Sequence, residues 1–488
     1  MWKYAGILIL SILISTHVYA QEMMSVNQVH KETYELYQKQ QWQQLILLGE
    51  KYIEQGIDFY YLRLRMGIAY YELKKYRKSA VFFQKLSQQN PEDVSLKEYL
   101  YFSYILGGRN IDAIRMQNDL PQSVKKKYSI GKTKLISGIY TETKYEFIDD
   151  YTVDSDQIQE QTVRNYFHHY SLGLNHQLGS RVSLFHAYSW VDLKNSSVLE
   201  GISFNEKISQ NQYYLKSSFR LGCGTELIFG GHWLRTKLKG YPLSAETIIE
   251  SAMKISKLKG ASIAGNGNGG NGNGNGNGNG GNGDGESGEG GNGDEGSGDG
   301  EDSVPASTVE IEPYVNTQNS YIGILGLHQD ISNWKVSLGL LYFEANHLTR
   351  WQQELSVRYY PKGNLNLYLM GGFTNQMEEK LETGWLNRQY WKGGLGFRIA
   401  KNTWGQVGYS FGDMYMQVEN EGYSVFNGVN HVKTKIDISC YQYVFKGKLS
   451  LFLLYQHQKE KNTYVISDIL NSQHVNVQSI TGGVKWKF

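Results

Sequence analysis

The chain has 488 residues, of which 40% are hydrophobic and 20% are charged, and its mean hydropathy is −0.47. Such a polar chain is not a helical membrane transporter, because that class needs several runs of about 20 apolar residues. The 49 basic and 47 acidic residues leave a formal net charge of +2, which gives no bulk signal for nucleic acid, and the 2 distant cysteines exclude a disulfide framework or a zinc site.

The first residues, Met1–Ala20, have the pattern of a secretory signal peptide. Lys3 supplies the positive start, Tyr4–Ile14 the apolar core, and Val18–Ala20 the small-residue cleavage site. The apolar core is too short for the alternative, a membrane anchor, so we expect cleavage after Ala20. No second apolar run of comparable length follows. An exported chain of this kind can enter a membrane only as a barrel.

Residues 21–128 are predicted to form a periplasmic domain of helical repeats. The best repeat unit, Tyr60–Asp93, resembles the tetratricopeptide (TPR) pattern, in which small residues let two helices approach and a proline ends the second helix. The neighbouring units are degenerate, and the alternative is an unrelated helical bundle. TPR arrays bind peptides or partner proteins in a concave groove. The residues that carry the resemblance, and that we expect to pack the array and shape a partner groove, are Gly67, Tyr70, Tyr76, Ser79, Phe83 and Pro91.

Beyond Lys127 the helical period gives way to alternation of apolar and polar residues, in segments long enough for tilted membrane strands. Short turns and longer links alternate between these segments, as in an up-and-down barrel with both ends on the periplasmic side. The fold class predicted is therefore α+β multidomain, with residues 129–488 forming an antiparallel transmembrane β-barrel of about 14 strands. A soluble sandwich is the alternative. Candidate strands begin near Lys134, Arg164, Arg181, Gln210, Thr225, Asn319, Trp334, Arg350, Asn364, Arg388, Thr403, His431, Lys448 and Val475.

The last predicted strand ends in an aromatic residue, with Val484, Trp486 and Phe488 on one face. This pattern resembles the C-terminal signature that the assembly machinery of bacterial outer-membrane barrels reads. It predicts the outer membrane of a Gram-negative bacterium as the location. Outer-membrane lipid and the barrel assembly machinery are then the expected partners.

A tract of Gly, Asn and acidic residues, 260–306, interrupts the barrel. With almost no apolar residues it cannot offset the entropy of ordering, so we expect a disordered insertion in an extracellular loop. A calcium-binding β-roll is the alternative, but its later Asp and its buried apolar residue are missing. Just before it, Ser244–Leu258 is expected either as a short helix that plugs or caps the barrel or as a simple strand extension.

The strand face opposite the apolar one is expected to line the lumen, and it carries more basic than acidic residues. Two interpretations stay open. A cationic lumen favours anionic solutes, whereas an internal ladder of ion pairs holds a closed barrel rigid. A register slip of one residue would move a strand's whole set to the lipid face. The candidate lumen residues are Lys216, Arg220, Arg358, Lys392, Arg398, Lys433 and Lys435.

Motifs for chemistry are absent: the chain contains no H-E-x-x-H, no G-x-S-x-G and no Walker loop. We therefore expect no catalytic residue, no cofactor, no metal site and no nucleic-acid partner. A barrel-embedded lipid-modifying enzyme is the least favoured alternative.

A signal peptide, a periplasmic TPR-like domain and a C-terminal barrel together resemble two families, the exopolysaccharide secretion porins and the surface lipoprotein assembly modulators. The likeness is one of architecture, supported by the TPR-like residues and the terminal strand. It implies a barrel that exports or translocates a polysaccharide or protein cargo recruited by the TPR domain. The alternative is a non-transporting barrel that anchors surface loops and a periplasmic complex.

Overall fold

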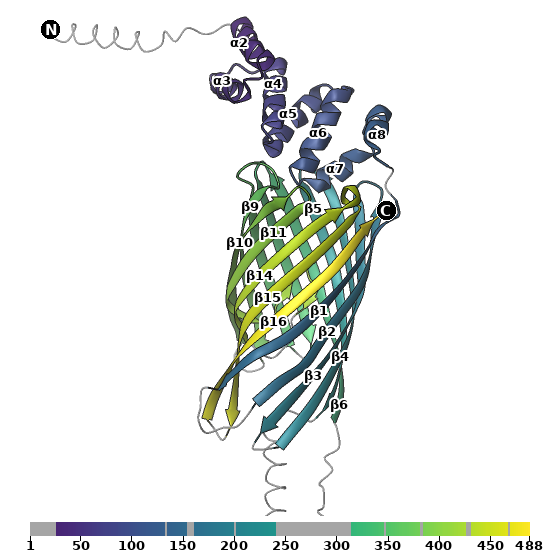
Figure 1. Ribbon diagram of the computed structural model, residues 1–488, viewed down its shortest axis with the longest axis vertical. Coiled ribbons are helices and arrows are strands. Elements are labelled where there is room, and N and C mark those ends of the chain that lie inside the picture. The colour runs from purple at the N-terminus through teal and green to yellow at the C-terminus, as the bar shows by residue number, and fades with distance from the viewer. Residues whose placement is uncertain are drawn as a thin grey trace, which may run out of the picture.

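The computed structural model combines a domain of helices with one large β-barrel (Figure 1). It describes residues 26–131, 134–153, 161–199, 202–240, 314–345, 348–380, 384–425, 431–466 and 469–488. The predicted signal peptide, the stretch Ser244–Leu258 and the insertion at 260–306 lie outside these residues.

Each of the first five helices of the helical domain packs against the next one, and the first also reaches the third. Its apolar residues form two clusters, one that includes Leu45 and Met66 and one that includes Phe83 and Leu100. None of the described helices is long and apolar enough to cross a bilayer. The helices are α2 (Val26–Gln38), α3 (Trp42–Glu54), α4 (Tyr60–Glu72), α5 (Tyr76–Gln89), α6 (Val94–Leu106), α7 (Asn110–Gln117) and α8 (Gln122–Tyr128).

Helices α4 and α5 form an antiparallel pair whose close approach depends on small residues. A Cβ atom on Gly67 would lie 3.2 Å from the ring of Phe83, and the Ser79 hydroxyl donates to the Gly67 carbonyl at 2.9 Å. Tyr70 lies in α4, Tyr76 begins α5, and Pro91 follows the end of α5 at Gln89. Five of the six TPR-like residues thus lie in one helical hairpin, and Pro91 follows it. Whether this hairpin is a member of the TPR family stays a prediction.

The barrel is a single sheet of fourteen antiparallel strands that closes on itself, which confirms the predicted fold class. Closure joins β1 to β16, with Gly138 opposite Lys487. All fourteen predicted segments are strands. Their bounds are β1 (Ile136–Val153), β2 (Gln161–Leu178), β3 (Val182–Leu199), β4 (Ile202–Gly222), β5 (Thr225–Gly240), β6 (Tyr314–Ile331), β7 (Trp334–Ala345), β8 (Leu348–Tyr359), β9 (Leu367–Lys380), β10 (Gly384–Ala400), β11 (Thr403–Tyr415), β14 (His431–Val444), β15 (Leu449–Ile466) and β16 (Ile469–Lys487).

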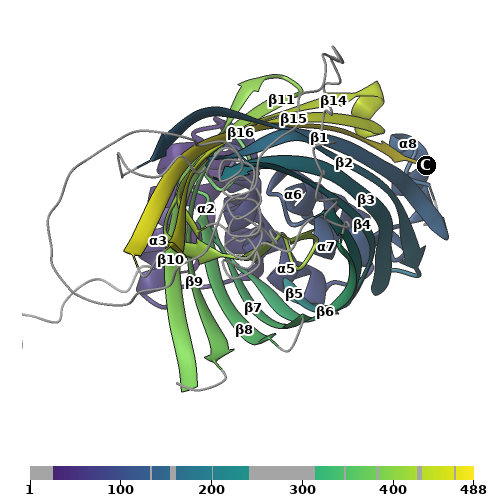
Figure 2. The ribbon, with the colours of Figure 1, turned by 90° about the horizontal axis from the view of Figure 1, so that it is seen from below.

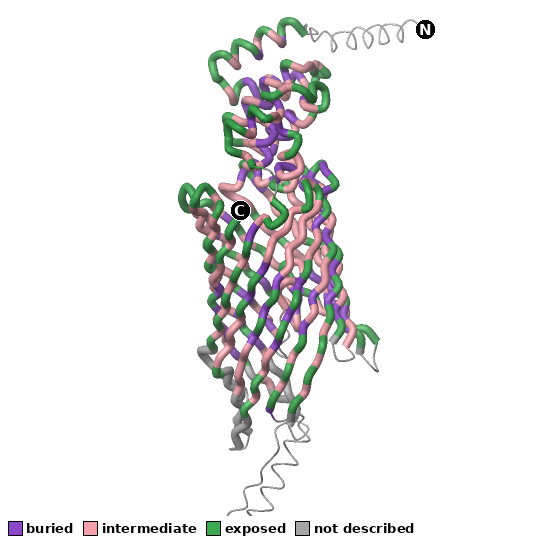
Figure 3. The backbone as a smooth tube through the Cα atoms, turned by 90° about the vertical axis from the view of Figure 1, so that its right-hand side faces the viewer, coloured by how far each residue is buried: buried purple, intermediate pink, exposed green. Residues whose placement is uncertain are grey.

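The outer surface of the barrel is apolar, as a surface in contact with lipid must be. Exposed residues alternate with less exposed ones along the tube in Figure 3. Val484, Trp486 and Phe488 are exposed together at the end of the chain, so the terminal pattern faces outward. Other exposed apolar residues on the strands include Leu172, Trp190, Leu215, Phe229, Leu325, Leu338, Leu355, Leu369, Trp391, Leu395, Ile438, Leu453 and Ile480.

Both ends of the barrel's chain lie beside the helices. In Figure 1 the C-terminus and the start of β1 meet at the upper rim, where the short turns also lie. We call this rim the helical mouth and the opposite rim the far mouth. The helical domain therefore lies against one end of the barrel.

Candidate functional site

The link between β11 and β14 folds back into the barrel. Residues 416–425 carry two short strands, β12 (Val418–Glu419) and β13 (Ser424–Val425), which pair with each other and not with the barrel. Figure 2 views the barrel along its axis from the far mouth. We call residues 416–425 the lumen hairpin, because its atoms contact strands on opposite sides of the wall.

The tip of the lumen hairpin has a left-handed backbone conformation that few residue types adopt readily. Asn420, Glu421 and Gly422 all have positive φ, at 54°, 57° and 84°. A Cβ on Gly422 would lie 2.3 Å from a methyl carbon of Ile324 on β6. Glycine is therefore required there for both its φ and its size.

Wall side chains bind the hairpin through its backbone. The Gln352 amide donates to the Val418 carbonyl and accepts from the Val418 N–H at 3.2 Å, as a neighbouring strand would. The Tyr214 hydroxyl donates to the Glu421 carbonyl at 2.7 Å, and His232 donates through Nδ1 to the Gly422 carbonyl at 2.7 Å. These bonds satisfy backbone groups that are taken out of water.

An apolar patch inside the lumen receives the hairpin. Val418 is buried among wall residues of β4 to β7, and Tyr423 and Val425 pack against the same cluster. This inner patch departs from the alternation expected of a polar lumen, since β6 is apolar on both faces around Ile322 and Ile324. The wall residues of the patch are Tyr214, Leu234, Ile322, Ile324, Leu341 and Phe343.

Two lumen lysines from the sequence-predicted set form ion pairs with the hairpin. Lys216 donates to a Glu421 carboxylate oxygen at 2.7 Å, and His328 approaches the other oxygen at 3.1 Å. Lys435 donates to both Glu419 oxygens, at 2.6 and 2.7 Å, and is 2% exposed. Both acids come from the hairpin, and they add to two acids of the wall, Asp437 at 4.0 Å from Lys435 and Glu226 at 3.4 Å from His328.

Four of the other five predicted basic residues have partners elsewhere. Lys433 pairs with Asp413 at 2.8 Å, in a separate ion-pair cluster between β11 and β14. Arg220 and Arg398 bond to oxygens of the turns at the helical mouth, and Arg358 lies over the Tyr368 ring. Lys392 lies opposite Gly372 across the β9–β10 pair. Three of the seven predicted residues thus follow the ladder interpretation, and anion selectivity stays a prediction.

Sequence reasoning missed the hairpin and the residues that hold it. Arg350 is fully enclosed, pairs with Glu378 and donates to the Met416 carbonyl at 3.2 Å. His232 and Gln352 bear no motif. In the sequence these residues are recognisable only as polar residues on the inward face of a strand. The alternation of polar and apolar residues does not predict the lumen hairpin that they contact.

Helix α5 docks onto the helical mouth through one buried arginine. Arg77 donates to the Asp330 carboxylate at 2.6 Å and to the carbonyl oxygens of Ser332 and Trp334 at 2.9 and 3.1 Å. Its guanidinium lies 3.9 Å from the centre of the Tyr360 ring, and its side chain is 0% exposed. This side chain therefore joins a helix to the turn between β6 and β7.

Further contacts fix the orientation of the helices. Asp112 accepts from the Gly224 N–H at 2.9 Å, and Arg115 donates to the Leu221 carbonyl at 2.7 Å, both at the turn between β4 and β5. On another part of the rim, Asn364 donates to the Lys74 carbonyl at 2.9 Å. Helices α5 and α7 therefore hold several turns of the mouth at once.

No family model matches the chain, and no curated protein matches its sequence. Among solved structures, it is similar to the Pseudomonas putida toluene transporter TodX, with a TM-score of 0.44 and 9% identity over 72% of this chain and 90% of that one. A Pseudomonas aeruginosa FadL homologue gives a TM-score of 0.40 and 8% identity over 77% and 92%. The translocator domain of NalP from Neisseria meningitidis gives 0.28 and 9% over 79% and 99%. Likeness at these scores assigns no substrate to this chain.

Proposed function

We propose that this protein is a gated barrel of the Gram-negative outer membrane that translocates a cargo delivered by its helical domain, which lies in the periplasm. The observation that carries the proposal is the lumen hairpin. A barrel of about eight strands is filled by its own side chains, whereas wider barrels leave space for a channel or a plug. Here the lumen hairpin occupies part of that space, in contact with the wall side chains around it.

The hairpin is suited to move because the barrel does not depend on it for closure. Its strands pair only with each other, and the wall closes through β1 and β16. Its two ion pairs and its side-chain bonds to the wall can exchange with water or with a polar cargo. Displacing it breaks no backbone hydrogen bond of the barrel, so a gate at this position leaves the wall intact.

The helical domain is placed to receive the cargo. It is held over one mouth by Arg77 and by the α7 contacts, so a bound cargo would stand close to the lumen entrance. Both a protein and a polysaccharide remain consistent with a polar, charged lumen. Removing residues 26–128 should leave a folded barrel that releases no cargo at the surface, and normal release would refute recruitment.

Planar-bilayer conductance tests the gate directly. Replacing residues 416–425 by a Gly/Ser linker should convert a nearly closed barrel into one with large, steady conductance. The matched control is deletion of the insertion at 260–306, which should leave conductance low. A hairpin-deleted barrel that is folded and still does not conduct would refute transport and favour the anchoring function.

A further inference from the structure

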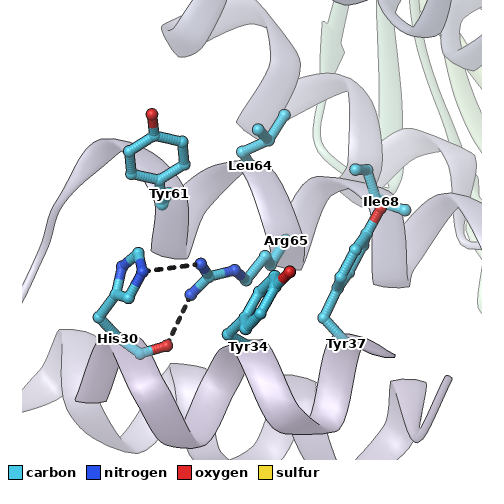
Figure 4. Close-up of a pocket in the computed structure, with 7 residues that line it drawn as sticks. All are labelled: His30, Tyr34, Tyr37, Tyr61, Leu64, Arg65 and Ile68. Atoms are coloured by element: carbon cyan, nitrogen blue, oxygen red, sulfur yellow. Dashed lines mark hydrogen bonds between the residues drawn. The ribbon is translucent and has the colours of Figure 1, made fainter. Parts of the chain in front are cut away.

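A second polar site lies in the helical domain, in a pocket between α2 and α4. The cavity has a volume of about 440 Å³. Figure 4 shows its lining side chains around the guanidinium of Arg65. The lining residues are His30, Tyr34, Tyr37, Tyr61, Leu64, Arg65 and Ile68.

Arg65 is a buried cation without an acidic partner. Its Nη1 donates to the His30 carbonyl and to the Thr33 hydroxyl, each at 2.9 Å, and its Nη2 lies 3.3 Å from His30 Nε2. It forms no ion pair with any carboxylate in the described part of the chain, and it is 6% exposed. Burial lowers the pKa of Arg65, and three nearby tyrosines partly offset this effect. A buried cation is stabilised by an anion that enters from outside.

The guanidinium keeps donors for such an anion. An arginine has five N–H groups, and the bonds within the described residues use two on Nη1 and one on Nη2. The Nε–H and one Nη2–H remain, and these two form the parallel pair that a carboxylate accepts side by side.

The walls of the pocket are aromatic and aliphatic. The Arg65 guanidinium lies 5.0 Å from the Tyr34 ring centre and 6.0 Å from that of Tyr61. These two rings are 44% and 54% exposed, so their faces are open to a ligand. Leu64 and Ile68 complete an apolar side of the pocket, which suits a hydrocarbon side chain better than a sugar ring bearing hydroxyl groups.

We propose that this pocket binds a peptide segment that carries a carboxylate next to an apolar side chain. The carboxylate pairs with Arg65, and the apolar group lies between the tyrosines and the aliphatic side. The proposal rests on the proposed function, in which the helical domain recruits cargo, and it makes that cargo a protein.

The test uses the full chain in lipid nanodiscs and two matched probes. One is the peptide acetyl-Gly-Gly-Leu-Phe with a free C-terminal carboxylate, and the other is the same peptide as its C-terminal amide. Saturation-transfer NMR titration should give a dissociation constant roughly tenfold lower for the acid, the factor expected from one charge-assisted pair. Equal affinity for the two peptides would overturn the proposal.

Variants assign the effect to the pocket. Arg65→Lys keeps the charge but loses the paired donors, so it should remove most of the preference for the acid. Tyr61→Ala should weaken both probes. The control is Arg63→Met, because Arg63 lies on the same helix, bonds to Asp58 and does not line the pocket. Thermal melting verifies that each variant is folded, and a folded Arg65→Lys variant with the full preference would refute the role of Arg65.

A competing probe decides the class of ligand. Glucuronate carries a carboxylate on a sugar ring, and it should compete poorly with the peptide. Competition at equal concentration would overturn the peptide assignment in favour of an acidic glycan. Binding needs no transport. A pocket that binds in a barrel that never conducts refutes the proposed function alone, whereas a conducting barrel with no peptide binding refutes only this inference.

Discussion

Arginine 77 offers the sharpest perturbation of the contact between the two domains. Its guanidinium pairs with Asp330 at 2.6 Å, and the two side chains are 0% and 2% exposed. Replacing Arg77 by Met removes this pair and the bonds to the Ser332 and Trp334 carbonyls. The Asp330 carboxylate then stays buried without its cation.

The expected loss follows from that orphaned carboxylate. Removing one partner of a buried ion pair costs about 3–5 kcal/mol. Since about 1.4 kcal/mol is a factor of ten, docking of α5 should weaken by a hundredfold or more. The double variant Arg77→Met with Asp330→Leu should recover much of the loss, because it leaves no unpaired charge.

Two measurements follow docking and folding separately. Double electron–electron resonance between spin labels on α4 and on the turn between β7 and β6 should change from one narrow distance to a broad distribution in Arg77→Met. Heat modifiability on gels should show an unchanged barrel. Arg63→Met, at an exposed ion pair with Asp58, is the control and should keep the narrow distance. A narrow distribution in the Arg77→Met variant would refute the assigned role of this side chain.

Three further predictions concern the hairpin and the helices. Gly422→Ala should displace the lumen hairpin, because its methyl would overlap Ile324, and single-channel recording should show more frequent opening. Lys435→Met leaves Glu419 buried without its cation, so the closed state should be less stable and the same recording should show a shorter closed time. Burial, followed by the bond to Glu32, raises the pKa of Tyr52 to about 12, so the stability that Tyr52 contributes is present below pH 10 and is lost as pH rises toward 12.

Each of these has its own control. For the hairpin variants, the control is Gly371→Ala, which places a methyl group in open space on β9 and should leave the conductance unchanged. If the Gly422→Ala barrel stays closed, the predicted overlap with Ile324 is contradicted. For Tyr52, circular dichroism measures the melting temperature of the helices between pH 8 and pH 11. This melting temperature should fall more steeply with pH in the parent than in Tyr52→Phe. If the melting temperatures of the two proteins fall in parallel with pH, the Tyr52 hydroxyl contributes nothing to the stability of the helical domain.

The barrel was predictable because its information is local. A strand that faces lipid on one side alternates whatever its neighbours are, so segments such as Leu449–Ile466 could be found one at a time. The α4–α5 hairpin was predictable for a similar reason. Gly67 and Ser79 are small where two consecutive helices must approach, and both residues lie within one short stretch of the sequence.

The candidate gate and the docking of α5 were not predictable, because in both the contacting residues are distant in sequence. Tyr214 and Glu421 are 207 residues apart, and Arg77 and Asp330 are 253 apart. Alternation identifies which side chains face the lumen but not what fills it. It placed Lys216 and Lys435 inside without revealing the acids that meet them.

The sequence by itself therefore determined the two-part architecture, the strand number and the faces of the strands, since each depends on periodicity within a segment. The tertiary structure alone decided that a loop enters the lumen, that it carries the compensating acids, and that α5 and α7 dock on one mouth. Those features depend on closure of the sheet, which brings residues far apart along the chain to opposite sides of one enclosed space.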